Sequence, residues 1–163
     1  MPVAWDTTLV SRIHPESDAF AYFDRSLSGD EPVLIPATAV SEVVWGLARG
    51  AREAPRFDRA LRWLKDLLGR ADVAVLPLTA DAAFAAGQLR SLAPVPQSGR
   101  RDRRRTKPER RVAWVLDMHV AATAWAFGVP VQTENVSDFT LLSGLLAELY
   151  PRAQPLGVLP SPL

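Results

Sequence analysis

Short apolar runs of strand length alternate with segments of helical periodicity along most of the chain. β-branched residues are frequent in the runs, whereas the intervening segments repeat apolar residues every three or four positions. This pattern predicts strands at Pro2–Trp5, Pro32–Ile35, Val73–Leu76 and Val129–Gln132. It predicts helices at Ser17–Leu27, Thr38–Gly50, Phe57–Leu68, Thr79–Leu92, Ala113–Phe127 and Leu141–Leu149. Such alternation favours a three-layer α/β/α fold, with a mainly parallel central sheet flanked by helices.

The length of 163 residues suits one domain with a real core, and we expect a single domain over residues 1–163. Residues 93–111 contain three prolines and many arginines, which predicts a long basic loop inserted in that domain. Residues 151–163 form a proline-rich tail, in which Leu156–Leu159 is expected to add an edge strand.

The N-terminus has neither a basic segment nor a long apolar segment, so we expect a cytoplasmic protein. The most apolar window, Val112–Val131, is long enough to cross a bilayer but contains Asp117 and His119. We therefore expect no membrane association, and a buried helix and strand in this window.

Four carboxylates, those of Asp6, Glu42, Asp117 and Asp138, lie at or beside the ends of apolar segments. Asp6 closes the first predicted strand, the segment containing Asp138 follows the fourth, and Asp117 is expected near the start of its helix. In a parallel sheet these positions face one crevice at the carboxyl ends of the strands. Since the chain has no cysteine, a metal there would have oxygen or histidine ligands, which favours a hard cation.

Each of these acids also has an ordinary structural interpretation. Asp6, Asp117 and Asp138 are placed where aspartate commonly caps or stabilises a helix N-terminus. Glu42 shares a helix stripe with Thr38, Trp45 and Arg49, opposite an apolar stripe, and an isolated glutamate there is usually solvent-exposed. His119 on its apolar helix is more often a core residue than a ligand. For Trp45, as for the other tryptophans in predicted elements, we expect a packing role.

Taken together, these segments resemble the PIN-domain ribonucleases, and among them the VapC-type toxins of toxin–antitoxin pairs. The resemblance runs from about Pro2 to Leu146, and its motifs are VAWDTT, IPATAVSEVVWGLARG, VLPLTADAAFAAGQLR, VLDMHVAATAWAFGVPVQTENVSDF and LLSGL. It implies a Mg²⁺- or Mn²⁺-dependent endoribonuclease that hydrolyses RNA phosphodiester bonds, is neutralised by a cognate VapB-like antitoxin and forms a homodimer.

The resemblance also implies roles for individual residues. Asp6, Glu42 and Asp117 match the first three acids of the family, and the fourth polar position is Asp138 or the nearby Asn135. The implied metal ligands are Asp6, Asp117 and Asp138, and the implied supporting residues are Thr7, Thr133 and Asn135. Thr8 departs from the family, which usually has asparagine there. Glu134 is an additional acid that is either a ligand or surface charge.

Positive charge is concentrated in one segment. Arg100–Arg111 carries eight basic residues and two acids, whereas the rest of the chain carries eleven basic residues and sixteen acids. Such a cluster attracts phosphate backbones, although composition alone slightly favours a solvated surface insertion. We expect RNA or partner contacts from Arg12, Arg49, Arg100, Arg101, Arg103, Arg104 and Arg105. The alternative function is a catalytically weak PIN-like module that binds RNA or protein through the arginine-rich loop.

Overall fold

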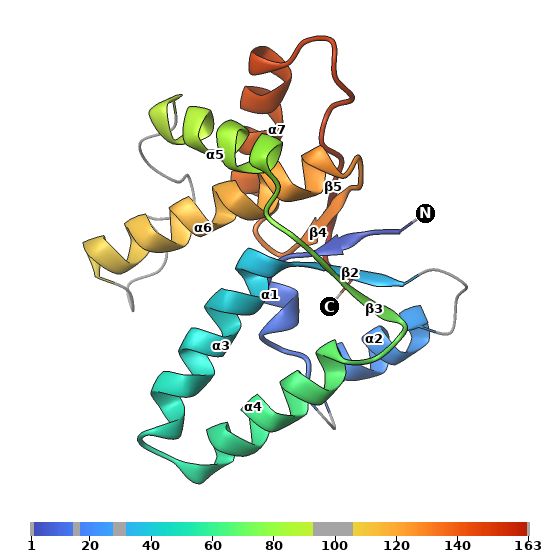
Figure 1. Cartoon of the computed structure of the whole chain (residues 1–163), viewed down its shortest axis with the longest axis vertical. Coiled ribbons are helices and arrows are strands. Elements are labelled where there is room, and N and C mark those ends of the chain that lie inside the picture. The colour runs from blue at the N-terminus through green and yellow to red at the C-terminus, as the bar shows by residue number, and fades with distance from the viewer. Residues whose placement is uncertain (1, 15–16, 28–31, 93–105, 163) are drawn as a thin grey trace.

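The computed structural model describes residues 2–14, 17–27, 32–92 and 106–162, and every structural statement below concerns these residues. Its centre is a five-stranded sheet in which all neighbouring strands are parallel (Figure 1). The strands are β1 (Ala4–Trp5), β2 (Val33–Pro36), β3 (Val73–Leu76), β4 (Val131–Thr133) and β5 (Val158–Pro160), in the order β3-β2-β1-β4-β5. The predicted α/β fold is confirmed, and the edge strand expected in the tail is present as β5.

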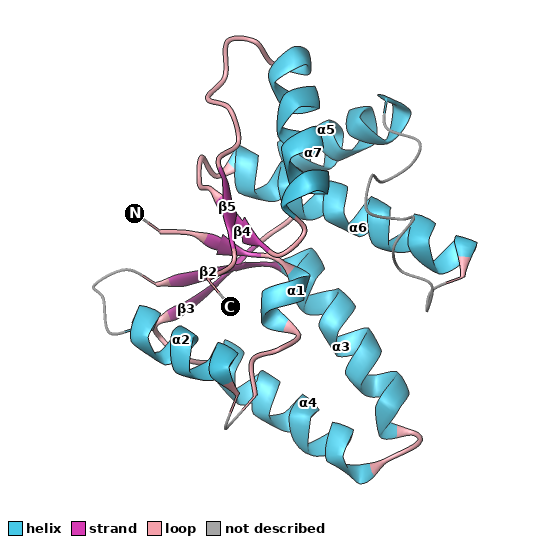
Figure 2. Ribbon diagram, turned by 180° about the vertical axis from the view of Figure 1, so that it is seen from behind, coloured by secondary structure: helices cyan, strands magenta, loops and turns pink. Residues whose placement is uncertain are grey.

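Seven helices in the described part of the chain flank the sheet. They are α1 (Thr7–Val10), α2 (Asp18–Leu27), α3 (Ala37–Ala51), α4 (Pro55–Leu68), α5 (Ala80–Leu92), α6 (Lys107–Ala126) and α7 (Val136–Leu149). Both overall views place α2 and α4 on one side of the strands and α5, α6 and α7 on the other (Figures 1 and 2). The six predicted helices are therefore all present, and the short α1 is added.

Side-chain alternation shows how α2 covers the sheet. Trp5 and Gln132 are opposite each other in the β1–β4 pairing and so point to the same face. The Tyr22 ring of α2 stacks on Trp5 with 5.5 Å between centroids, and its hydroxyl lies 3.2 Å from Gln132 Nε2. This contact pairs a buried amide with a partner, and it anchors α2 beneath the two central strands.

Small residues allow the helices to pack closely. Helices α5 and α6 pack on each other, and both carry fully buried alanines, among them Ala82 and Ala85 of α5 and Ala121 of α6. At the α3–α4 turn, a Cβ on Gly50 would lie 2.8 Å from the ring of Phe57, so the ring occupies the space that only glycine leaves. None of the described helices is both long and apolar enough to span a membrane.

Two predicted boundaries are wrong, and both affect the candidate site. Helix α6 begins at Lys107, so the end of the predicted 93–111 loop is helical and Asp117 lies mid-helix. Its start is fixed by a capping box, in which Thr106 Oγ1 accepts from Glu109 N and Glu109 Oε2 accepts from Thr106 N. Helix α7 begins at Val136, so Asp138 lies in its first turn and does not precede it. Residues 93–105 of the predicted loop lie outside the described residues.

Candidate active site

The candidate site lies where the strand order reverses. β1 has β2 on one side and β4 on the other, and crevices at such switch points are where open parallel sheets bind ligands. Asp6 directly follows β1 and Thr133 ends β4. The Asp6 amide donates to the Gln132 carbonyl at 3.2 Å, so the two strand ends are joined at this point.

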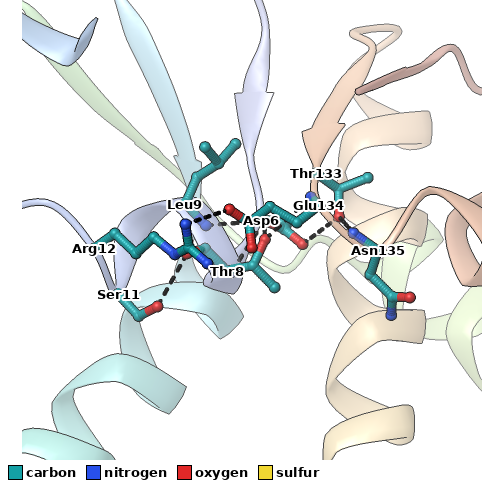
Figure 3. A network of polar contacts seen from close by, with 8 residues as sticks. All are labelled: Asp6, Thr8, Leu9, Ser11, Arg12, Thr133, Glu134 and Asn135. Carbon is teal, nitrogen blue, oxygen red and sulfur yellow. Dashed lines mark hydrogen bonds and ion pairs between the residues drawn. The ribbon is translucent and has the colours of Figure 1, made fainter. Parts of the chain in front are cut away.

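The Asp6 carboxylate is 1% exposed and is held through both oxygens (Figure 3). Oδ1 accepts from Thr8 N at 3.0 Å, Leu9 N at 3.2 Å and Thr8 Oγ1 at 2.6 Å. Oδ2 accepts from Thr133 Oγ1 at 2.6 Å. Asp6 is thus the N-cap of α1, as its ordinary interpretation predicted, and it is also bonded to the end of β4.

The bonds continue from Asp6 to a second carboxylate. Thr133 Oγ1, which donates to Asp6, accepts from Asn135 N at 2.8 Å. Asn135 Nδ2 then donates to Asp138 Oδ2 at 2.8 Å, and Asp138 is 1% exposed. We call Asp6, Thr8, Thr133, Asn135 and Asp138 the Asp6 network. It contains two of the four predicted acids and both candidates for the fourth polar position.

Burial dominates the electrostatics of Asp6. Desolvation raises the pKa of its carboxyl above the ordinary value of 3.8, and hydrogen bonds from Thr133, Thr8 and Leu9 oppose that rise without cancelling it. The protein therefore stabilises the charged form less than water does. A cation beside Asp6 would compensate this cost.

Thr8 joins the two strand-end loops, although it replaces the family's usual asparagine. Its hydroxyl donates to Asp6 Oδ1 at 2.6 Å and accepts from Glu134 N at 3.3 Å. Glu134 itself, the additional acid, has its carboxylate 2.8 Å from the Arg12 guanidinium. Arg12 thus pairs with Glu134 at the rim of the Asp6 network (Figure 3).

Glu42 lies on α3 and faces a groove between α3 and α6. The groove has a volume of about 550 Å³, and its lining includes Glu42, Trp45, Arg49, Glu109, Val112 and Leu116. We call it the α3–α6 groove. The predicted stripe of Glu42, Trp45 and Arg49 therefore shares one surface, but the packing role expected for Trp45 is wrong, because this residue is 61% exposed.

Asp117 and His119 occupy the middle of α6. Asp117 is partly buried and comes one residue after Leu116 of the groove. Residues two apart on a helix do not face each other, so His119 points away from Asp117. Burial, and then the positive charge of Arg90 on α5, lower the pKa of His119 below its ordinary value of 6.5. His119 is accordingly neutral at pH 7 and belongs to the α5–α6 side of the helix.

The oxygen-rich donors around Asp6 fit a hard divalent cation. Within the described residues, Oδ2 of Asp6 accepts from Thr133 alone, so it retains acceptor capacity. Thr7 Oγ1, next in sequence, is buried without a hydrogen-bond partner in the same part of the chain. The described residues contain no group of three histidine, aspartate or glutamate side chains close enough to form a complete metal site by themselves.

The sequence contained signals for two features that the hydrophobic pattern did not predict. The Thr106-Lys-Pro-Glu109 motif is a capping-box signature, with proline in the first helical turn, and it marks the true start of α6. Asn135 precedes a helix that was expected only from Leu141.

Of the predicted RNA- or partner-binding arginines, Arg49 lines the groove and Arg12 pairs with Glu134. Arg100, Arg101, Arg103, Arg104 and Arg105 lie outside the described residues.

Solved structures similar to this chain share its fold at low sequence identity. VapBC2 from Rickettsia felis, bound to a promoter DNA fragment, matches with a TM-score of 0.58 and 16% identity over 98% of both chains. FitAcB from Neisseria gonorrhoeae matches with a TM-score of 0.57 and 18% identity, over 98% of this chain and 96% of that one. VapBC-5 from Mycobacterium tuberculosis, a member of the VapBC family of toxin–antitoxin systems, matches with a TM-score of 0.52 and 21% identity, over 99% and 98%.

Sequence comparison gives the family directly. A search of curated proteins finds no match. The family model for the PIN domain matches residues 3–135, which include Asp6, Glu42, Asp117 and the Thr133–Asn135 segment. The chain belongs to the PIN-domain family.

Proposed function

We propose that this protein is a Mg²⁺- or Mn²⁺-dependent endoribonuclease of the VapC type, the toxin of a toxin–antitoxin pair. One observation carries the proposal: a buried, desolvated Asp6 carboxylate lies at the switch point of a parallel sheet and connects through Thr133 and Asn135 to Asp138. Membership of the PIN family supports nuclease chemistry at that position.

Asp6, Asp117 and Asp138 are the proposed metal ligands, and Glu42 completes the catalytic acids. When bound, a divalent cation supplies Lewis-acid activation of water and neutralises charge that develops on the phosphate. Thr8 and the start of α1 hold Oδ1 of Asp6, while Thr133 orients Oδ2. Asn135 orients Asp138 in the same way, and Thr7 contributes a buried hydroxyl beside Asp6.

The partners follow from the similar solved structures only as a proposal. VapBC-5 belongs to a family of toxin–antitoxin systems, and VapBC2 and FitAcB have the same fold over nearly their whole chains. We therefore include a cognate VapB-like antitoxin and a homodimeric toxin in the proposed function. Co-purification with the product of the adjacent reading frame, followed by mass measurement in solution, tests both.

Cleavage assays with Asp6→Asn test the catalytic proposal. Asparagine caps helices about as well as aspartate, so the variant removes the charge while keeping the start of α1. Wild type should cleave RNA with Mg²⁺ or Mn²⁺ and not with EDTA, and Asp6→Asn should be slower by about 100-fold or more. Asp81→Asn, which changes an exposed acid on α5, is the matched control and should cleave like wild type.

Two results would contradict the proposal. Equal cleavage by wild type and Asp6→Asn under all metal conditions would exclude a carboxylate–metal mechanism at Asp6. RNA binding without any cleavage would instead support the catalytically weak binding module.

A further inference from the structure

Trp45 is the exposed aromatic side chain nearest in sequence to a proposed catalytic acid. It lies three residues after Glu42 on α3, which places the two side chains on the same face of the helix, about 4.5 Å apart along its axis. Both line the α3–α6 groove, and Trp45 is 61% exposed. Its ring therefore presents a flat apolar surface in the same groove as a proposed catalytic acid.

We infer that Trp45 is the platform of a nucleobase subsite, on which an unpaired base of single-stranded RNA stacks next to the phosphate being cleaved. The inference rests on the proposed ribonuclease function and names one element of its substrate recognition. Base–aromatic stacking is the usual way in which proteins hold unpaired nucleotides, because every base has a π-face.

The surroundings of Trp45 suit a base. The guanidinium carbon of Arg49 lies 5.6 Å from the centroid of the Trp45 ring, so a cation already contacts the indole. The groove volume of about 550 Å³ falls within the range of small-molecule sites. Both helices extend from the sheet toward the same side of the molecule (Figures 1 and 2), and the groove is lined by residues 41–49 of α3 and 108–116 of α6.

The charges of the groove match the polar parts of a nucleotide. Glu109 is held in place by the capping box, since its Oε2 accepts from Thr106 N at 2.8 Å and from Thr106 Oγ1 at 2.9 Å. Such a fixed carboxylate, together with Glu42, is an acceptor for the N–H groups on a base edge. The first two turns of α6 also carry Lys107, Arg110 and Arg111, which attract the phosphates on either side.

The same charges disfavour a protein segment as the occupant. Glu42, Glu109 and Arg49 line the groove, and an apolar helix seated there would remove these three charges from water. Trp45 and Val112 are the strongly exposed apolar residues among its lining residues, which is a small anchor for a protein interface. A nucleotide offers one flat apolar surface surrounded by donors and a charged backbone.

Equilibrium binding to RNA that cannot be cleaved tests the subsite. Affinities would be measured in EDTA on the Asp6→Asn background, with a mixed-sequence single-stranded RNA of about ten nucleotides and a duplex of the same length. Trp45→Ala should weaken single-strand binding by about 5- to 150-fold, while duplex binding changes little because duplex bases are already stacked. Trp45→Phe should recover most of the affinity.

Phe84→Ala is the matched control, because Phe84 is 68% exposed on α5 and lies outside the groove. Single-strand affinity of Trp45→Ala equal to that of Phe84→Ala would overturn the inference. An equal loss for single strand and duplex, or a loss confined to antitoxin binding, would overturn it as well. A failure of the proposed nuclease function would give a different result, because the wild type would then bind RNA through Trp45 without cleaving it.

Discussion

The Asp6 network and the α3–α6 groove are neighbouring parts of the candidate site, linked through α1, which contacts α3. They differ in what holds them. In the network, Asp6 and Asp138 are each 1% exposed, and short hydrogen bonds from Thr8, Thr133 and Asn135 fix their carboxylates. In the groove, Trp45 is largely exposed and Arg49 lies 3.8 Å from Glu109, which is a weak pairing.

This difference separates folding from binding. Folding itself desolvates and orients the network, so its hydrogen bonds form whether or not a ligand is present. The groove leaves the Trp45 ring largely in water, so this ring contributes little to folding and its surface can contact a ligand. Substitutions in the two regions should consequently affect different measurements.

Thr133→Val should have the largest effect on stability. Valine keeps the shape of threonine but removes the donor to Asp6 Oδ2 and the acceptor for Asn135 N, both buried or nearly so. The loss of a hydrogen bond to a charged group should lower the free energy of unfolding by about 2–3 kcal/mol in urea titrations with EDTA. Trp45→Ala in the groove should change it by less than about 1 kcal/mol. Similar losses in both variants would remove the distinction between the two regions.

Much of the fold and part of the site follow from the sequence. Strands that are buried on both faces need continuous apolar runs, and those runs located four strands to within about two residues. Because parallel strands end at one edge of their sheet, Asp6 and the Thr133–Asp138 segment were predicted to meet, and the hydrogen bonds through Thr133 join them.

The remaining features depend on information that local patterns do not contain. The start of α6 was missed because prolines and arginines outweighed a four-residue capping motif, and a helix that starts at Lys107 extends well beyond its apolar part. Periodicity placed Trp45 on the same stripe as Glu42. Periodicity did not show that α6 leaves the Trp45 side chain uncovered, because the separation of two helices depends on the packing of the whole domain.

Adding metal should stabilise the protein through the Asp6 network and not through the α3–α6 groove. A ligand that binds only the folded state adds about 2.7 kcal/mol of stability at a concentration of 100 times its Kd. Mg²⁺ or Mn²⁺ should raise the unfolding midpoint of wild type and of Trp45→Ala alike, and this gain should disappear in Asp6→Asn. A gain that survives in Asp6→Asn would place the cation elsewhere.

The pH dependence of stability without metal should have a smaller and directional effect. Burial raises the pKa of Asp6 in the folded protein above its ordinary value of 3.8, so the folded state holds this proton more tightly than the unfolded state. The contribution of Asp6 to stability is therefore fully present below about 3.8 and is lost as the pH rises through the raised pKa. In EDTA, Asp6→Asn should gain stability relative to wild type as the pH rises above about 4. A difference that stays constant with pH would mean that Asp6 titrates normally.

The Arg12–Glu134 pair should give the smallest effect, and it tests where the network ends. Its atoms are 2.8 Å apart, but the two side chains are 55% and 27% exposed, so solvent screens their attraction. A double-mutant cycle with Arg12→Ala and Glu134→Gln should give a coupling of about 0.5 kcal/mol that falls as salt is added. Because the Glu134 carboxylate pairs with Arg12, Glu134→Gln should keep the stabilisation by Mg²⁺ that Asp6→Asn loses. If Glu134→Gln also loses the stabilisation by Mg²⁺, then Glu134 belongs to the metal site and pairs with Arg12 only when no metal is bound.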